Sequence, residues 1–88
     1  MTAKYPQRKQ IEECIKRAKA RVIAAGSNAY AFVCVDASGP AVWDLASYER
    51  EGNEKDCVAA VWSYRDGSYD DANVFHENGR IAAAVECY

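Results

Sequence analysis

The sequence predicts an α+β domain in which one N-terminal amphipathic helix packs on a five-stranded, mostly antiparallel meander sheet. Apolar residues recur at helical spacing over residues 6–25, which indicates the helix. Two dipeptides, Asp66-Gly67 and Asn78-Gly79, interrupt strand-like residues, and both tolerate the positive φ angles of a two-residue hairpin turn. Because 88 residues is the size of a single domain, we expect residues 1–88 to fold as one unit.

The predicted helix spans residues 6–25. Pro6 suits the first helical position, where its missing N–H has no intrahelical partner, and Gly26 suits a left-handed cap at the other end. Six apolar residues fall within a stripe about 100° wide, which is typical of one buried helix face. These residues are Ile11, Cys14, Ile15, Ala18, Val22 and Ala25. The outer face is basic, but it lacks aromatic residues, so direct nucleic-acid binding is disfavoured.

Strands are predicted over residues 29–36 and 41–47. The first is apolar on both sides of its alternation, which indicates a strand buried on both faces. Ser38-Gly39, followed by Pro40, indicates a turn between them. A two-residue turn at this position would pair Cys34 with Trp43 and Phe32 with Leu45.

Residues 49–56 are densely charged and contain Gly52-Asn53, so we expect an exposed loop. An alternative stays open over residues 53–62, because Asn53 could cap a helix that carries Glu54 and Asp56 in its first turn. The downstream turns require strands on both sides, and this favours a strand from residue 57.

The last three strands are predicted over residues 57–65, 68–77 and 80–88. Their register places Trp62 opposite Asp71, and Asp71 opposite Glu86, on one face that is aromatic and acidic. Two carboxylates directly opposite each other are unfavourable unless a cation lies nearby.

The other face of the predicted sheet is small and aliphatic, and we expect the helix to cover it because alanine and valine allow close approach. The aromatic face then lacks a cover. The alternative stays open that the helix covers the aromatic face, which would leave the valine-rich aliphatic face uncovered instead. Each aromatic side chain can bury roughly 150–250 Å², and several together exceed the patch that a soluble monomer usually exposes. We therefore expect another molecule to cover this face. Its residues are Tyr30, Phe32, Trp43, Leu45, Trp62, Tyr64, Tyr69, Phe75 and Tyr88.

The composition of this face favours a basic protein partner, because Trp and Tyr dominate interface hot spots and carboxylates accept hydrogen bonds from Arg and Lys. The candidate partner-binding residues are Trp62, Tyr64, Tyr69, Asp70, Asp71, Glu77, Glu86 and Tyr88. The chain is similar in size and charge to stand-alone inhibitors, such as phage-encoded proteins that block a nucleic-acid-binding machine. The alternative is a homodimer through a sheet face, acting as a structural or ligand-binding domain.

Charge is unevenly distributed along the sequence. Residues 1–28 hold seven bases and two acids, whereas residues 29–88 hold four bases and eleven acids. Such asymmetry can mark a binding surface. No apolar run is long enough to span a bilayer, and no apolar segment follows the polar N-terminus as in a signal peptide. We expect a cytoplasmic protein without membrane contact.

Catalysis, cofactors and metals find little support. His76 is the single histidine, and no motif brings an acid or a nucleophile to it, so a small enzyme or a metal site at His76 is the disfavoured alternative. The four cysteines lie at least twenty residues apart, unlike paired zinc ligands. We expect them to be reduced and buried, with Cys14, Cys57 and Cys87 in the aliphatic layer. No cofactor is expected.

Overall fold

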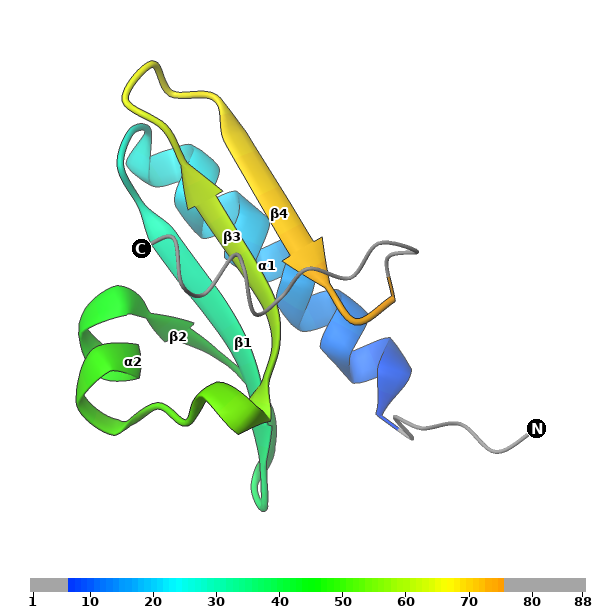
Figure 1. Ribbon diagram of the computed structural model, residues 1–88. Coiled ribbons are helices and arrows are strands. Elements are labelled where there is room, and N and C mark those ends of the chain that lie inside the picture. The colour runs from blue at the N-terminus through cyan, green and yellow to red at the C-terminus, as the bar shows by residue number, and fades with distance from the viewer. Residues whose placement is uncertain (1–6, 76–88) are drawn as a thin grey trace.

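The computed structural model describes residues 7–75, which form two α-helices and a four-stranded antiparallel sheet of order β2-β1-β3-β4 (Figure 1). The elements are α1 (Arg8–Ala25), β1 (Tyr30–Asp36), β2 (Gly39–Asp44), α2 (Leu45–Glu51), the 3₁₀ turn η1 (Glu54–Asp56), β3 (Cys57–Ser63) and β4 (Tyr69–Asn73). The α+β class, the N-terminal helix and the antiparallel sheet are confirmed. Residues 7–75 hold four strands, where the prediction gave five over the whole chain, and the fifth, predicted over residues 80–88, lies outside the described residues.

Helix α1 covers the aliphatic face, as predicted. Five residues of its stripe are buried against β1 and β3, where Ala31, Val33, Ala59 and Val61 face it. The sixth predicted residue, Ala25, is exposed because the helix ends there. Gly26 takes a φ of 92°, and its N–H donates to the Val22 carbonyl at 3.1 Å, which closes the last turn.

The β1–β2 hairpin turns one residue earlier than predicted, at residues 37–38, and this shifts the strand pairing by two residues. The Asp36 carboxylate accepts a hydrogen bond from the Ser38 N–H at 2.8 Å, and Gly39 takes a φ of 101°. The register therefore pairs Phe32 with Trp43, where Leu45 was predicted. A shift of two residues preserves the faces of a strand, so the predicted separation of aromatic and aliphatic sides holds.

Helix α2 replaces the end of the second predicted strand and part of the predicted loop over residues 49–56. Asp44 caps it, because its carboxylate accepts a hydrogen bond from the Ser47 N–H at 2.7 Å. Tyr48 is buried, and its ring stacks on the ring of Phe32 with centroids 4.1 Å apart. Gly52 lies so close to Tyr48 that an added Cβ would fall 2.5 Å from the Tyr48 carbonyl oxygen. This helix was not predicted from the sequence.

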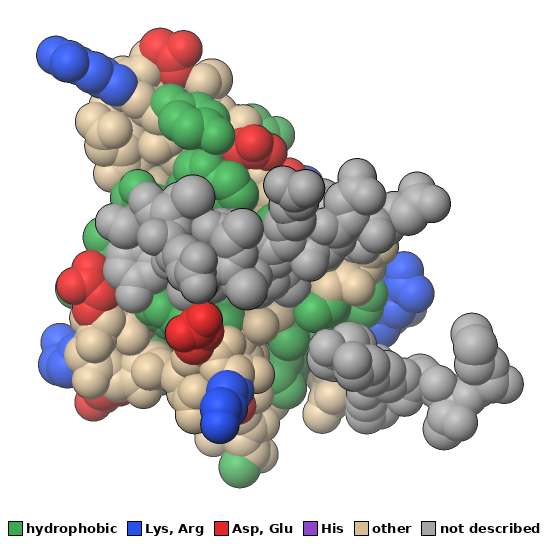
Figure 2. Space-filling model, in the orientation of Figure 1, with side chains coloured by type: hydrophobic (Ala, Val, Ile, Leu, Met, Phe, Trp, Pro, Cys, Tyr) green, Lys and Arg blue, Asp and Glu red, His purple; other side chains and the backbone are tan. Residues whose placement is uncertain are grey.

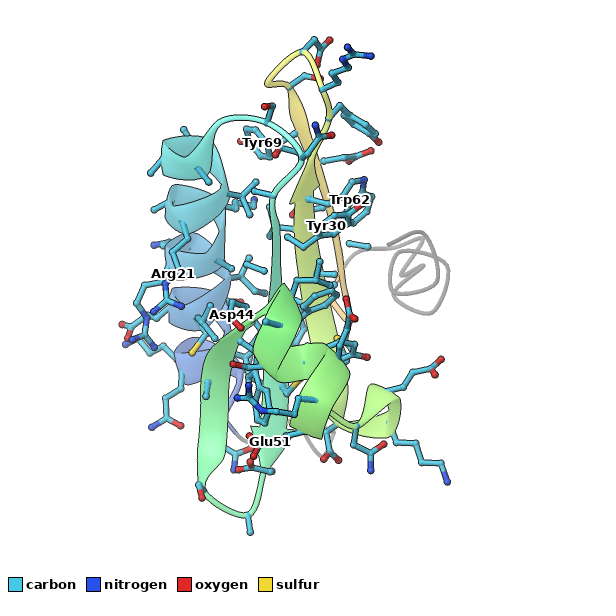
Figure 3. The ribbon with its side chains drawn as sticks, turned by 90° about the vertical axis from the view of Figure 1, so that its left-hand side faces the viewer. Arg21, Tyr30, Asp44, Glu51, Trp62 and Tyr69 are labelled. Carbon is cyan, nitrogen blue, oxygen red and sulfur yellow. The ribbon has the colours of Figure 1, made fainter. Side chains whose placement is uncertain are left out.

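The position of α2 also changes the strand order. The helix packs on β1 and β2 from the face opposite to α1 (Figures 1 and 3). The chain then enters β3 on the far side of β1, and β3 pairs with β1. The predicted meander, in which the third strand would follow the second, is therefore wrong. The alternative over residues 53–62 is settled in favour of a strand: Asn53 caps only the short turn η1, and β3 begins at Cys57.

The β3–β4 hairpin has a three-residue loop instead of the predicted two. The Tyr64 N–H donates to the Ser68 carbonyl at 2.8 Å, and Gly67 takes a φ of 88°. Trp62 consequently pairs with Asp70, where Asp71 was predicted. A slip of one residue moves every side chain of β4 to the opposite face. Asp71 therefore points toward α1, where its carboxylate lies 3.3 Å from the Lys19 ammonium.

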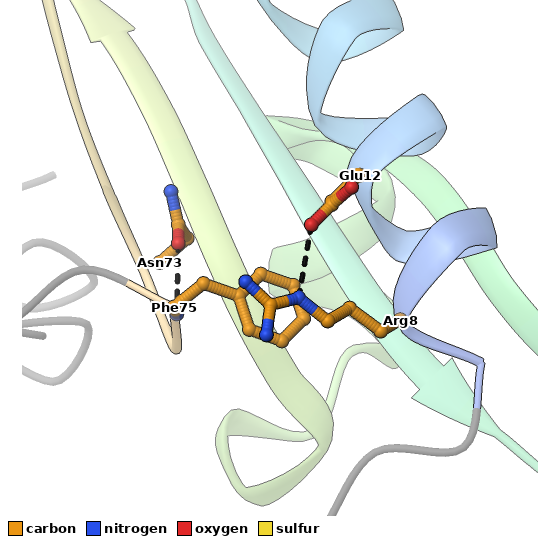
Figure 4. A network of polar contacts seen from close by, with 4 residues as sticks. All are labelled: Arg8, Glu12, Asn73 and Phe75. Atoms are coloured by element: carbon orange, nitrogen blue, oxygen red, sulfur yellow. Dashed lines mark hydrogen bonds and ion pairs between the residues drawn. The ribbon is translucent and has the colours of Figure 1, made fainter. Parts of the chain in front are cut away.

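The chain leaves the sheet after Asn73, four residues before the predicted end of this strand. The Asn73 side chain accepts a hydrogen bond from the Phe75 N–H at 2.9 Å and turns the backbone. Phe75 packs against the α1 side of the sheet, with the Arg8 guanidinium 4.5 Å from its ring centroid (Figure 4). Its predicted place on the aromatic face is therefore wrong.

Candidate protein-binding surface

The predicted partner-binding residues fall into three groups. Trp62, Tyr64 and Asp70 lie together on the α2 face of the sheet, because Trp62 pairs with Asp70 and Tyr64 follows Trp62 by two residues. Tyr69 and Asp71 lie on the α1 face, as a result of the one-residue slip. The remaining three, Glu77, Glu86 and Tyr88, lie outside the described residues, so the predicted pair of Asp71 and Glu86 is untested. The cation beside Asp71 is the ammonium group of Lys19.

A chain of hydrogen bonds joins the residues on the α2 face. The Trp62 indole N–H donates to the Tyr64 hydroxyl at 3.2 Å, and that hydroxyl donates to the Asp70 carboxylate at 3.5 Å. Tyr64 remains 47% exposed and Asp70 is exposed. The aromatic rings are therefore held in place by polar contacts while their surface stays accessible, which lowers the entropy lost on binding.

The α1 face of the same hairpin presents a second exposed aromatic residue. Tyr69 is 45% exposed, and Ile23 on α1 is 55% exposed. The Lys19–Asp71 contact aligns α1 with β4 in opposite directions, and Gly26 lies near Gly67 at the turn. Ile23 lies one helical turn beyond Lys19, and Tyr69 lies two residues before Asp71 on its strand. Each is a step of roughly 6 Å in the same direction, and Ile23 therefore lies beside Tyr69.

The turn between β3 and β4 adds charge to this end of the molecule. Asp66 accepts hydrogen bonds from the Ser68 hydroxyl at 2.6 Å and from the Ser68 N–H at 3.0 Å. These two bonds hold the pKa of the Asp66 carboxyl below its usual range, so the group stays ionised at neutral pH. We call the exposed set Tyr64, Asp66, Tyr69, Asp70 and Ile23 the hairpin end.

The hairpin end combines apolar and acidic side chains at one pole of the molecule. Figure 2 shows hydrophobic and acidic side chains next to one another over the end that carries the β3–β4 turn. Figure 3 shows Tyr69 near the C-terminal end of α1, with Trp62 on the other side of the sheet. Trp62, Tyr64, Tyr69 and Asp70 were predicted from the sequence as binding residues, but Ile23 was not. The only signal for Ile23 in the sequence is that it is apolar and lies outside the buried stripe of the helix.

The wide, uncovered aromatic face that the sequence predicted is not present in this form. Helix α2 packs on it, Phe32 is buried beneath Tyr48, and four further residues are half-buried around them. These four are Tyr30, Trp43, Leu45 and Trp62. Exposed aromatic surface in residues 7–75 is therefore concentrated at the hairpin end, in Tyr64 and Tyr69.

Cys14, Cys34 and Cys57 are buried and carry free thiols, as predicted. Cys57, however, lies in the aromatic layer with Cys34 and not in the aliphatic layer. Among residues 7–75, no three His, Cys, Asp or Glu side chains are placed to hold a metal ion. His76 and Cys87 lie outside that range. No helix within the described part of the chain is long and apolar enough to cross a membrane.

Comparisons with known proteins give no relative: no family model, no curated protein and no solved structure matches the chain.

Proposed function

We propose that the protein is a small, non-enzymatic binding module whose hairpin end docks on a basic surface of another protein in the cytoplasm. The observation that supports this proposal most strongly is the exposure of Tyr64 and Tyr69 beside the exposed acidic side chains of Asp66 and Asp70. Tyrosine supplies a large contact area with little conformational entropy, and it is enriched among the residues that dominate interface energies.

The carboxylates specify the kind of partner. Asp66 and Asp70 are exposed and lie in or beside the turn, which also carries the exposed Arg65. A guanidinium or ammonium group can reach these carboxylates and form charge-assisted hydrogen bonds, and the same charges repel phosphate. A basic protein surface therefore fits better than nucleic acid. The sharpest form of the proposal is an inhibitor of the phage type, which would occupy the basic groove of a nucleic-acid-binding machine.

The test is a pull-down from nuclease-treated extract of the host, comparing the wild-type protein with a Tyr64→Ser, Tyr69→Ser double variant. Both tyrosines are about half exposed, so the variant should fold. A Glu49→Gln variant is the matched control, because Glu49 is exposed on α2, away from the hairpin. We expect wild type and control to retain the same basic protein, and the double variant to lose it. Equal retention by all three proteins would contradict the proposal.

A second candidate is a homodimer. The sequence led us to expect it through a sheet face, but β2, the outer strand of the sheet in residues 7–75, favours a dimer through the sheet edge. One hydrogen bond shows which backbone N–H and C=O groups of β2 point away from β1. Ser63 N–H donates to the Ala29 carbonyl at 2.9 Å, so odd-numbered residues of β1 bond toward β3 and even-numbered ones toward β2. Phe32 pairs with Trp43, and the backbone groups of Pro40, Val42 and Asp44 therefore point away from β1.

This edge is self-complementary. In a two-fold antiparallel pairing centred on Val42, each Pro40 faces the Asp44 of the other copy. Pro40 has no N–H to donate to the Asp44 carbonyl of the other copy. That carbonyl is not left without a donor, because as the cap of α2 it already accepts a helical hydrogen bond. A hollow of about 380 Å³ lies along the edge, and its lining includes Arg21, Asp44 and Glu51, which Figure 3 labels.

Light scattering over a range of concentrations tests this dimer. Val42→Pro removes only an outward-pointing N–H, so it should shift the association to higher concentration while leaving the β1–β2 pairing intact. A wild-type chain that stays monomeric at the highest concentration would remove this candidate.

A further inference from the structure

Cys34 and Cys57 are directly opposite each other on the two central strands. The β1–β3 register pairs them at the end of the ladder, after a β-bulge between Val33 and Cys34. Both are buried in the same cluster on the α2 face, with exposed fractions of 3% and 7%. The pairing joins residues separated by a hairpin, a helix and a turn in the sequence.

The bulge is what brings the two thiols together. Side chains of a regular strand alternate between the two faces of the sheet. With Ala59 on the α1 face, Val58 would then lie on the α2 face and Cys57 on the α1 face. In the structure, Val58 and Ala59 both pack on the α1 side, and Cys57 packs with Cys34 on the other. Bulges commonly redirect a side chain in this way, often beside functional sites.

The geometry suits a disulfide. Directly paired residues of antiparallel strands have Cα atoms about 4.5–5.5 Å apart, and disulfides span Cα separations of roughly 4.4–6.8 Å. We propose that Cys34 and Cys57 form a redox-active dithiol site that reacts with small disulfides such as oxidised glutathione and closes a reversible cross-strand disulfide between β1 and β3. This inference is independent of the proposed binding function.

The two thiols have different roles in the reaction. A hydrogen bond from the Cys34 thiol lowers the pKa of Cys57, and the same bond, together with burial, raises the pKa of Cys34. Cys57 also follows the short turn η1, whose residues Glu54 and Lys55 are exposed. Because the thiolate is the nucleophile and Cys57 is next to the surface, Cys57 is the thiol that attacks first.

Two successive thiol–disulfide exchanges complete the reaction. The Cys57 thiol loses its proton to solvent, and its thiolate attacks one sulfur of the small disulfide, so that a mixed disulfide forms and one small thiolate leaves. The Cys34 thiol then loses its proton to solvent, and its thiolate attacks the Cys57 sulfur, which expels the second small thiolate. The protein gives up two electrons and two protons, the small disulfide takes up the two electrons, and its two thiolates are protonated in water. Dithiothreitol reverses the reaction.

The experiment incubates the native, full-length protein with oxidised glutathione and follows intact mass and peptide maps. We expect the wild type to lose the mass of two hydrogen atoms, to yield one cross-linked peptide pair containing Cys34 and Cys57, and to melt at a higher temperature. Cys34→Ser should stop at a mixed disulfide and gain one bound glutathione at Cys57. Cys57→Ser should gain none at Cys34, because Cys34 is only 3% exposed and its sulfur can attack only a disulfide already held at Cys57.

Circular dichroism establishes that each variant is folded, and serine is a conservative replacement for a thiol. Cys14 is the internal control, since it is equally buried but has no opposing cysteine among residues 7–75. A wild-type protein that keeps both thiols while native, or one whose cross-link joins Cys14 or Cys87 instead, would overturn the proposal.

Discussion

Replacing Tyr48 by alanine tests whether α2 closes the aromatic face of the sheet. Tyr48 is the buried residue of α2, with 4% of its surface exposed, and its ring lies 4.1 Å from that of Phe32 at an interplanar angle of 15°. Truncation removes this stack and opens a gap above Phe32, which is itself 1% exposed.

The expected loss is large for a chain of this size. Burying an aromatic side chain removes roughly 150–250 Å² from water, which at about 25 cal/mol/Å² corresponds to roughly 4–6 kcal/mol. Measured costs of replacing a buried aromatic residue by alanine are about 3–5 kcal/mol. Helix α2 has only seven residues and can settle into part of the gap, so we expect about 3 kcal/mol. Small domains have a total stability of about 5–15 kcal/mol.

Urea denaturation monitored by circular dichroism measures this loss, with Tyr48→Phe and Glu49→Ala as matched controls. Tyr48→Phe keeps the ring and should cost no more than about 1.5 kcal/mol. Glu49→Ala changes an exposed residue of the same helix and should stay within about 0.5 kcal/mol of wild type. If Tyr48→Ala were as stable as Glu49→Ala, α2 would not be packed on the sheet as described.

Three further predictions concern an ion pair between α1 and β4, the cap of α2 and the β3–β4 turn. A double-mutant cycle with Lys19→Met and Asp71→Asn should give a coupling of about 0.5–1 kcal/mol that weakens in high salt, because this pair is partly exposed; zero coupling would contradict the contact. The hydrogen bond donated by the Ser47 N–H lowers the pKa of Asp44 in the folded state, so its stabilisation of α2 is complete above the ordinary pKa of 3.8 and is lost as pH falls through the lower folded value; an NMR titration midpoint at or above 3.8 would count against this cap. Gly67→Ala should cost about 1 kcal/mol or more in urea denaturation, because the φ of 88° is strained for alanine, and Gly67→Asn should cost less.

The two hairpins show how much of the register the sequence could predict. In both, a turn with glycine was identified, but the loop boundaries were set by aspartate side chains that the turn rule ignores. Asp36 holds the first loop at residues 37–38, one residue earlier than predicted, and Asp66 and Gly67 lengthen the loop of the second hairpin to three residues. The first error shifted the register by two residues and did no harm to the faces. The second shifted it by one and inverted β4.

Helix α2 was missed although its signals are present in the sequence. Asp44 precedes three residues with moderate or good helix propensity, and Leu45 and Tyr48 are spaced by one turn. The alternation of residues 41–47 competed with these signals and was read as a continuous strand. Only the burial of Tyr48 against Phe32, a contact between distant parts of the chain, decides between the two.

The candidate surface was predicted in composition but not in arrangement. Trp62, Tyr64 and Asp70 lie together because β3 pairs with the first residues of β4, which sets Trp62 opposite Asp70, and hydrogen bonds through the Tyr64 hydroxyl link the three. The position of Ile23 beside Tyr69 depends on the alignment of α1 with β4, which no local pattern encodes. The pairing of Cys34 with Cys57 was likewise hidden, because it requires both the strand order created by α2 and the bulge in β3.

Hydrogen-exchange mass spectrometry of the protein, alone and bound to the partner captured in the pull-down, tests the proposed binding surface most directly. We expect increased protection over residues 63–71 and at the C-terminal turn of α1, with β2 and α2 unchanged. Protection confined to the basic outer face of α1, with residues 63–71 exchanging as in the free protein, would contradict it.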